Sequence, residues 1–383
     1  MIPYGRQEIT PEDIQAVKSV LESDYLTQGP VVPLFEGTVA GYCGAKHAVA
    51  VNSATSALHI ACLALGLGPG DVLWTSPITF VASANCALYC GAEVDFVDID
   101  SETWNLSIDI LEKKLKKAKE CGRLPKIVVP VHLCGLPCDM RRIRELSREY
   151  GFRIIEDASH AIGATYLGEP VGNCRYSDIT VFSFHPVKII TTGEGGMAMT
   201  NDSELALKMN LFRSHGITRD PASMTHEPDG PWYYQQIELG FNYRMTEIQA
   251  ALGISQMRRL DSYVERRHLI AKQYRRSLQG LPFSFQKQSA ESYSAYHLFV
   301  IRLDLGKINL SHRQFFEALR KNNIGVNLHY IPVHLQPFYK SKGFFKGCFP
   351  EAERYYQEAI SLPLYSTLQE DDQQKVIELL KDI

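Results

Sequence analysis

Apolar and polar positions alternate with two different periods between residues 45 and 200. Short apolar runs, which are typical of buried strands, are separated by stretches in which apolar residues recur every three or four positions, as on one face of a helix. This alternation favours an α/β fold, in which helices cover both faces of a mostly parallel sheet. The expected strands are His47–Val51, Val72–Thr75, Glu93–Val97, Ile127–Val131, Arg153–Ile155, Ile179–Phe184 and Met197–Thr200, and the expected helices are Ser56–Leu65, Phe80–Cys90, Ile108–Glu120 and Met140–Tyr150.

A long helical stretch, Thr246–Leu278, contains few residues that break helices. We expect it to connect the large domain to a smaller α+β domain at the C-terminal end. The chain then divides into an N-terminal segment (1–30) with no clear place in the sheet, a large domain (31–245), and the linking helix with the small domain (246–383). In the small domain the pattern predicts strands at Tyr296–Leu303 and Gly325–Leu328 and helices at Gln314–Lys321, Glu351–Ala359 and Asp371–Leu380.

Composition narrows the possible partners. The 383 residues are 45% hydrophobic and carry a net charge of −3, which disfavours a nucleic-acid partner. The polar start lacks the apolar core of a signal peptide, and no apolar run is long enough to span a bilayer. We therefore expect a soluble, cytoplasmic protein without a membrane partner. The charged stretch Glu112–Glu120 is interpreted as the solvated face of a helix.

The nine cysteines are odd in number and spread along the chain. Cys86 with Cys90, and Cys134 with Cys138, form two C-x3-C pairs. Zinc sites usually have tighter spacings with partner histidines. We expect free thiols, neither disulfides nor a metal site, and the role of the two pairs stays open.

The segment 183–196 places one lysine, Lys188, shortly after an apolar run, with Gly193, Gly195 and Gly196 behind it. A lysine held at the end of a strand loses part of its hydration, which lowers its pKa and frees the amine to attack a carbonyl. The segment suits a Schiff base with an aldehyde cofactor, although a solvated lysine beside a turn gives the same pattern.

Two upstream segments agree with a cofactor site. Asp157 follows the strand Arg153–Ile155, and ligands of α/β sheets gather at the carboxyl ends of strands. A carboxylate there can pair with a protonated pyridine nitrogen, or simply cap a helix. The small-residue turn Asn52–Ser56 before a helix can bind a phosphate, or again only cap the helix. Together with Lys188 these are the parts of a pyridoxal phosphate site.

Six segments carry a resemblance to a known family: NSATSALH, SPITF, EDASHAIGA, SFHPVKIITTGEGG, RSHGI and GFNYRMTEIQAALG. In this order they resemble the fold-type I, pyridoxal 5′-phosphate (PLP)-dependent sugar aminotransferases of the DegT/DnrJ/EryC1/StrS family, from Ile2 to the end of the chain. The segments IPYGRQ, DYLTQGP, WYYQQIELGFNYRM and NLHYIPVH are similar to the branch that serves pseudaminic acid biosynthesis. That branch aminates carbon 4 of a UDP-linked 4-keto-6-deoxy-N-acetylhexosamine.

The resemblance implies roles for individual residues. Lys188 would form the Schiff base and afterwards carry the proton, and Asp157 would pair with the ring nitrogen. The glycines behind Lys188 would serve close backbone packing rather than phosphate binding. The other implied cofactor contacts are Ala54, Thr55 and Ser183 at the phosphate, Asn242 reaching the phosphate of a neighbouring subunit, Phe80 stacked on the ring, and His160 at the ring hydroxyl or the wall beside it.

The resemblance also implies the substrates and the assembly. L-glutamate would donate the amino group and leave as 2-oxoglutarate, and the protein would be a homodimer with shared active sites. The implied contacts to the UDP-linked keto sugar are Tyr4, Asp24, Tyr25, Leu26, Thr27, Asn327, Leu328, His329 and Tyr330.

Alternatives remain open at this stage. The substrate could be another nucleotide-linked keto sugar, such as UDP-4-keto-arabinose or a 3-keto sugar, because few pocket residues decide the choice. A dehydratase is disfavoured, because that branch of the family has histidine in place of the lysine. A non-catalytic sugar-nucleotide binder is disfavoured by the intact Lys188, Asp157 and phosphate turn.

Overall fold

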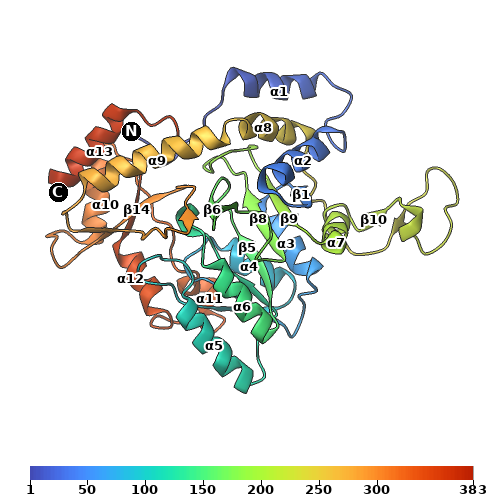
Figure 1. Ribbon diagram of the computed structural model, residues 1–383, viewed down its shortest axis with the longest axis horizontal. Coiled ribbons are helices and arrows are strands. Elements are labelled where there is room, and N and C mark those ends of the chain that lie inside the picture. The colour runs from blue at the N-terminus through green and yellow to red at the C-terminus, as the bar shows by residue number, and fades with distance from the viewer. Residues whose placement is uncertain (383) are drawn as a thin grey trace.

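A seven-stranded sheet forms the centre of the computed structural model, which describes residues 1–382 (Figure 1). Across the sheet the strands stand in the order β1-β9-β8-β5-β4-β2-β3. Their bounds are β1 His47–Val51, β2 Val72–Thr75, β3 Glu93–Phe96, β4 Ile127–Val129, β5 Arg153–Asp157, β8 Ile179–Ser183 and β9 Gly196–Thr200. Each expected strand of the large domain is present, with ends that differ by at most a few residues.

The sheet is mostly parallel, as the sequence predicts. β3, β2, β4, β5 and β8 pair in parallel, whereas β9 runs antiparallel to both of its neighbours, β8 and β1. Successive residues of β1 pack into different cores: Val49 and Val51 lie in the cluster that includes residues of α3, and Ala50 lies in the cluster that includes residues of α2. Both faces are therefore covered, which explains why the strands are apolar throughout.

Helices follow most of these strands, and several begin at side-chain caps. Ser53, Ser107 and Asp139 accept backbone N–H bonds at the starts of α3, α5 and α6, as N-cap residues do. Helix α5 carries the charged stretch Glu112–Glu120 on an exposed face. The helices before α9 are α1 Pro11–Leu21, α2 Val31–Cys43, α3 Ala54–Ala64, α4 Ala82–Tyr89, α5 Ile108–Glu120, α6 Met140–Tyr150, α7 Ser203–Arg213 and α8 Glu247–Met257.

On each edge strand of the sheet, an ion pair bonds the N–H and the carbonyl of one residue. At β3, Asp95 Oδ1 accepts the N–H of Phe96 (2.7 Å), Lys114 Nζ donates to the carbonyl of Phe96, and Lys114 pairs with Asp95. At β1, Glu36 Oε1 accepts the N–H of Ala50 (2.8 Å), Arg213 Nη1 donates to its carbonyl (2.7 Å), and Arg213 pairs with Glu36. At each edge an anion takes the N–H and a cation takes the carbonyl.

The small domain is built on an antiparallel sheet in the order β12-β14-β15, with α9, α10 and α13 packed around one core. Its elements are α9 Leu260–Ser277, β12 Phe283–Phe285, β14 Phe299–Leu303, α10 His312–Lys321, α11 Pro337–Lys340, α12 Pro350–Glu358, β15 Ala359–Leu362 and α13 Glu370–Asp382. A short sheet of β6 Thr165–Tyr166, β7 Glu169–Pro170 and β13 Ser292–Tyr293 connects the two parts, and the hairpin of β10 Ile217–Thr218 and β11 Gln235–Gln236 projects from the body (Figure 1).

Two predictions for the C-terminal part are wrong. Thr246–Leu278 is not one helix but two, because the backbone leaves the helical region at Arg259 (φ −112°, ψ 2°), where its guanidinium donates to buried Asp13 (2.6 Å). Gly325–Leu328 is not a strand: this segment and its neighbours form only isolated bridges, Ile2 with Ile324 and Asn327 with Ser361. In both cases the deciding partner lies far away in the sequence.

The N-terminal segment is more ordered than its polar sequence suggests. It contains α1, which packs on α8. The start of α2, where Pro30 has no side chain to cap the helix, is capped from α8: the fully buried Glu247 accepts the N–H groups of Val31 (2.6 Å) and Val32 (3.3 Å).

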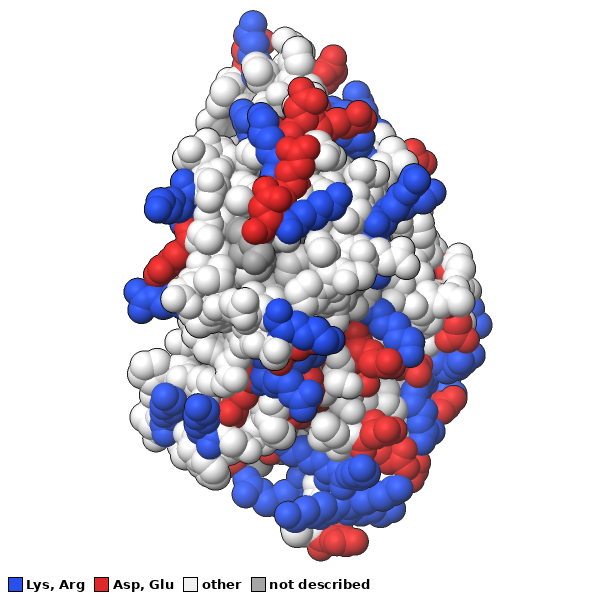
Figure 2. Space-filling view, turned by 90° about the vertical axis from the view of Figure 1, so that its left-hand side faces the viewer, with Lys and Arg blue, Asp and Glu red and all other residues white. Residues whose placement is uncertain are grey.

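Surface charges are mixed. Figure 2 shows Lys and Arg interspersed with Asp and Glu, with more basic side chains at the lower end, at the height of α5 in Figure 1.

Within residues 1–382 no helix combines the length and apolar character needed to cross a bilayer. The nine cysteines of the described chain are free, and Cys90 is only half-buried while Cys86 is buried.

Candidate active site

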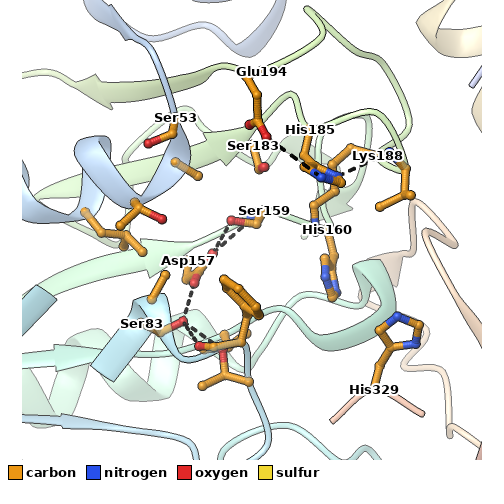
Figure 3. A pocket seen from close by; sticks show the side chains of 18 of the residues that line it. Ser53, Ser83, Asp157, Ser159, His160, Ser183, His185, Lys188, Glu194 and His329 are labelled. Carbon is orange, nitrogen blue, oxygen red and sulfur yellow. Dashed lines mark hydrogen bonds and ion pairs between the residues drawn. The ribbon is translucent and has the colours of Figure 1, made fainter. Parts of the chain in front are cut away.

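A cavity of about 780 Å³ lies where β1, β2, β4, β5 and β8 end. It is lined by segments that follow or complete these strands, by Tyr4 near the start of the chain, and by His329 and Tyr330 of the C-terminal part. The carboxyl edge of an α/β sheet is the expected place for a ligand, because the loops there converge. Figure 3 shows the labelled side chains of Asp157, Ser183, Lys188 and His160 facing a common space.

The turn before α3 presents hydrogen-bond donors to the cavity. Ser53 Oγ accepts the N–H of Ser56 (3.1 Å), and Ser56 Oγ donates to Asn52 Oδ1 (2.6 Å), which fixes the turn. Ala54 and Thr55 occupy the first two positions of the helix, where N–H groups have no partner within the helix. Such a turn at a helix N-terminus favours an anion.

Gly196 packs directly behind this turn. A Cβ atom at Gly196 would lie 2.5 Å from the nitrogen of Ala54 and from the carbonyl carbon of Ser53. Only glycine permits β9 to approach the turn so closely. Gly196 therefore fits the expectation that the glycines serve backbone packing. It packs against the phosphate turn as well as following the lysine segment.

Asp157 ends β5 and is 5% exposed. Its Oδ1 accepts from the hydroxyl of Ser159 (2.6 Å) and from the Ser159 N–H (3.1 Å), and its Oδ2 accepts from the hydroxyl of Ser83 (2.6 Å). The carboxylate is thus held in one orientation at the cavity wall. It does not act as a helix N-cap, because no helix begins at this position.

Lys188 lines the cavity from the loop between β8 and β9. Desolvation lowers the pKa of its amine to about 8, and the charge of Asp157 opposes this shift only in part. A substantial fraction of the amine is therefore neutral near physiological pH, as a nucleophilic lysine requires.

The histidines beside Lys188 are kept neutral. Burial, followed by the charge of Lys188, lowers the pKa of His329 to about 3 and places the pKa of His160 well below its usual range. His160 Nε2 contacts the Tyr330 hydroxyl (3.0 Å), and His329 Nδ1 contacts Ser361 Oγ (2.8 Å). His160 is 4% exposed, and its Nδ1 has no hydrogen-bond partner within residues 1–382.

The cavity is poor in positive charge. Among residues 1–382, Lys188 is the single Lys or Arg that lines it, against the carboxylates of Asp157 and Glu194. His185 lies 3.9 Å from Glu194, and Gln249 Nε2 donates to the carbonyl of Glu194 (2.8 Å). A ligand with several phosphate charges would need more hydrogen-bond donors than this chain supplies in the cavity.

The structure brings most of the predicted residues together. The cavity is lined by Tyr4, Ala54, Thr55, Phe80, Asp157, His160, Ser183, Lys188, His329 and Tyr330. Phe80 lies two residues before α4 and is 58% exposed, with its ring 6.3 Å from that of Tyr330.

Other predicted residues lie outside this cavity. Asp24, Tyr25, Leu26 and Thr27 are exposed near the start of α2, and Asn327 and Leu328, which precede His329 in the chain, are half-buried. The side chain of Asn242 is exposed, while its carbonyl accepts from Asn52 Nδ2 (3.4 Å) and the neighbouring Tyr243 carbonyl accepts the Asn52 N–H (2.8 Å). Asn242 thus lies next to the phosphate turn without facing this chain's cavity.

Sequence reasoning missed several polar residues of the cavity wall: Thr79, Ser83, Ser159, Glu194 and Gln249. Ser159 could have been found, because it follows Asp157 by two residues and can reach back to its carboxylate. Ser83 and Gln249 carry no local signal, since each meets its partner only through the tertiary fold.

The side chains and backbone groups of the cavity fit PLP. The turn of Ala54 and Thr55, together with the hydroxyl of Ser183, can hold a phosphate. Asp157 can pair with a ring nitrogen and Lys188 can bind an aldehyde, while Nδ1 of His160 has no partner within residues 1–382 and is available to a further polar atom. Fold and site together define a PLP-dependent aminotransferase. The chain belongs to the DegT/DnrJ/EryC1/StrS aminotransferase family, whose model matches residues 7–381.

Individual relatives cover the whole chain. The spore coat polysaccharide biosynthesis protein SpsC of Bacillus subtilis is 40% identical over 100% of this chain and 97% of its own length. The solved structure of Helicobacter pylori PseC, an aminotransferase involved in the biosynthesis of pseudoaminic acid, matches with a TM-score of 0.91 and 32% identity, covering 100% of this chain and 98% of that one. The putative sugar aminotransferase Spr1654 of Streptococcus pneumoniae, in its PLP form, matches with a TM-score of 0.88 and 29% identity, covering the same shares.

Proposed function

We propose that this aminotransferase transfers the amino group of L-glutamate to carbon 4 of a UDP-linked 4-keto-6-deoxy-N-acetylhexosamine, as a step of pseudaminic acid biosynthesis. The observation that carries the proposal is the joint placement of Lys188, Asp157 and the Ala54–Thr55 turn around one cavity. The match to PseC over the whole chain supports this branch, and the other sugar aminotransferases among the neighbours support the wider class.

In this proposal, PLP supplies an electrophilic carbonyl and an electron sink. The neutral amine of Lys188 would hold the cofactor's aldehyde, and its Nζ would carry a proton between the amino donor and the product once glutamate is bound. Its pKa of about 8 suits both tasks, because the amine can lose and regain a proton near the working pH. Asp157 holds the ring nitrogen, and Ala54, Thr55 and Ser183 hold the phosphate.

The remaining roles concern the ring and the sugar nucleotide. Phe80 would stack on the cofactor ring, and His160 would offer Nδ1 to its hydroxyl. Tyr4, His329 and Tyr330 line the cavity away from the phosphate turn and would contact the sugar or diphosphate. His329 is neutral, so it would donate or accept a hydrogen bond rather than supply a charge.

We further propose a cytoplasmic homodimer with shared active sites. The scarcity of cations in the cavity supports this, because the phosphates of cofactor and substrate need donors from outside the chain. Asn242 is exposed beside the phosphate turn, where it can reach a second subunit. Asp24–Thr27, Asn327 and Leu328 would contact the substrate at the boundary between the two subunits.

A mixing experiment tests the shared site. Lys188→Ala and Asn242→Asp each inactivate the homodimer, the second because it places a negative charge opposite a phosphate. A mixed dimer carries both lesions in one site and none in the other, so equal mixing should restore about a quarter of the wild-type sites. If mixing restores nothing while mixed dimers are present, Asn242 acts within its own chain.

The substrate is tested by two half-reactions. Glutamate should remove the visible absorption of the PLP-loaded enzyme, and the correct keto sugar should restore it and become an amino sugar, as expected for ping-pong kinetics. The candidates are the UDP-linked 4-keto-6-deoxy-N-acetylhexosamine, UDP-4-keto-arabinose and a 3-keto sugar, each compared with the Lys188→Ala variant. If only UDP-4-keto-arabinose or only the 3-keto sugar is aminated, that sugar takes the place of the proposed substrate. If glutamate leaves the visible absorption of the PLP-loaded protein unchanged, the protein is a binder without catalysis.

A further inference from the structure

Ser83 meets the carboxylate of Asp157 from a different part of the fold. It is the second residue of α4 and is 1% exposed. Its Oγ is 2.6 Å from Asp157 Oδ2, although 74 residues separate the two in the sequence. Figure 3 shows this contact on the side of Asp157 opposite to Ser159.

The direction of the hydrogen bonds follows from the donors available. An ionised carboxylate only accepts, so the single hydroxyl proton of Ser83 points to Asp157. Thr79 Oγ1 lies 2.7 Å from Ser83 Oγ, and with the Ser83 proton committed, Thr79 must be the donor. Thr79, Ser83 and Asp157 therefore form a chain of donated bonds that ends on the carboxylate.

The two oxygens of Asp157 are held differently. Oδ1 accepts both bonds of Ser159, which lies on the same strand end and moves with it. Oδ2 accepts from Ser83 on α4, which is packed against α3, the helix that begins with the phosphate turn. The Ser83 bond thus ties the carboxylate to the helices that frame the cavity, and it is charge-assisted.

We propose that Ser83, supported by Thr79, is a positioning residue for the cofactor: it fixes the Asp157 carboxylate so that this group can hold the PLP ring nitrogen. The inference rests on the proposed pairing of Asp157 with that nitrogen. Removing a hydrogen bond to a charged group changes an equilibrium constant by roughly tenfold to a hundredfold. Ser83→Ala should weaken PLP binding by this factor and shift the visible absorption band in the direction seen for Asp157→Asn.

Three further variants separate positioning from a loss of packing. Thr79→Val keeps the shape of the side chain but removes its donated bond, and should weaken PLP binding less than Ser83→Ala does. Ser83→Thr keeps the hydroxyl and should restore affinity and absorption. Ser147→Ala is the matched control: Ser147 is a buried helix serine whose hydroxyl also donates over 2.6 Å, to the carbonyl of Phe152, but it lies outside the cavity. It should leave PLP affinity unchanged.

The decisive experiment is a double-mutant cycle on PLP release from the loaded enzyme, followed by the decay of visible absorption on dilution. If Ser83 acts through Asp157, Ser83→Ala has no further effect in an Asp157→Asn background. Additive effects, or a Ser83→Ala enzyme with wild-type affinity and absorption, overturn the inference. An Asp157→Asn enzyme that binds PLP like the wild type overturns the proposed pairing itself, so the two failures are distinguishable.

Discussion

The most direct prediction concerns the pH at which Lys188 captures its cofactor. Only the neutral amine attacks the aldehyde, so the capture rate follows the neutral fraction of Lys188. Burial lowers the pKa of this amine from 10.5 to about 8. At pH 7 about one amine in ten is then neutral, against about one in 3,000 for an unperturbed lysine, which is a gain of about 300-fold.

The assay is the second-order rate of PLP capture by cofactor-free enzyme, followed by visible absorption between about pH 6.5 and about pH 10. The rate should rise about tenfold per pH unit at first and level off above about pH 8. Lys188→Ala, measured over the same pH range, gives the rate that is due to other lysines, and this rate is subtracted.

A rate that continues to rise to about pH 10 would show that Lys188 is solvated, and the argument from burial would be refuted. Asp157→Asn refines the test. Because the charge of Asp157 raises the pKa of Lys188, its removal should move the levelling point to lower pH. A shift to higher pH would contradict the electrostatic reasoning.

Three more predictions follow from buried contacts. In cofactor-free enzyme, Lys188→Met should raise the free energy of unfolding by about 3 kcal/mol at neutral pH, since protonated Lys188 is penalised only in the folded state. Because its folded pKa lies below the unfolded value, this gain should shrink as the pH rises from about 8 towards 10.5, and urea unfolding at several pH values checks it. Glu247→Ala should lower the free energy of unfolding by about 2–3 kcal/mol, because two N–H groups at the start of α2 lose a charged acceptor, and Glu247→Gln should cost less in the same urea titration. Gly196→Ala should displace the Ala54 turn and weaken PLP binding at least tenfold in a spectral titration, whereas Gly41→Ala, with open space around its Cβ, should not affect it.

The elements that could be predicted from sequence are those with local signals. Helices α5 and α6 begin and end where the pattern places them, because each has an N-cap side chain and a periodic apolar face. The strands of the large domain were recognisable because burial on both faces makes them apolar throughout. Lys188, Asp157 and the Asn52–Ser56 turn could be singled out because each follows such a strand, and all three line the cavity.

What could not be predicted depends on contacts between distant segments. At the break between α8 and α9, Arg259 bonds to Asp13, which is distant in the sequence, and no glycine or proline between residues 254 and 262 marks the break. The capping of α2 by Glu247 and the donation of Ser83 to Asp157 both join elements far apart in the chain. The exposed positions of Asp24–Thr27 likewise depend on packing that a single sequence does not reveal.

The ion pairs at the two edges of the central sheet have a consequence for solubility. An unpaired edge strand can recruit a strand from another molecule and so begin aggregation. Asp95 with Lys114 occupies the N–H and carbonyl of Phe96, and Glu36 with Arg213 occupies those of Ala50, so an added strand could not bond to these two residues. Each edge strand therefore offers a shorter run of free hydrogen-bonding groups to a strand of another copy.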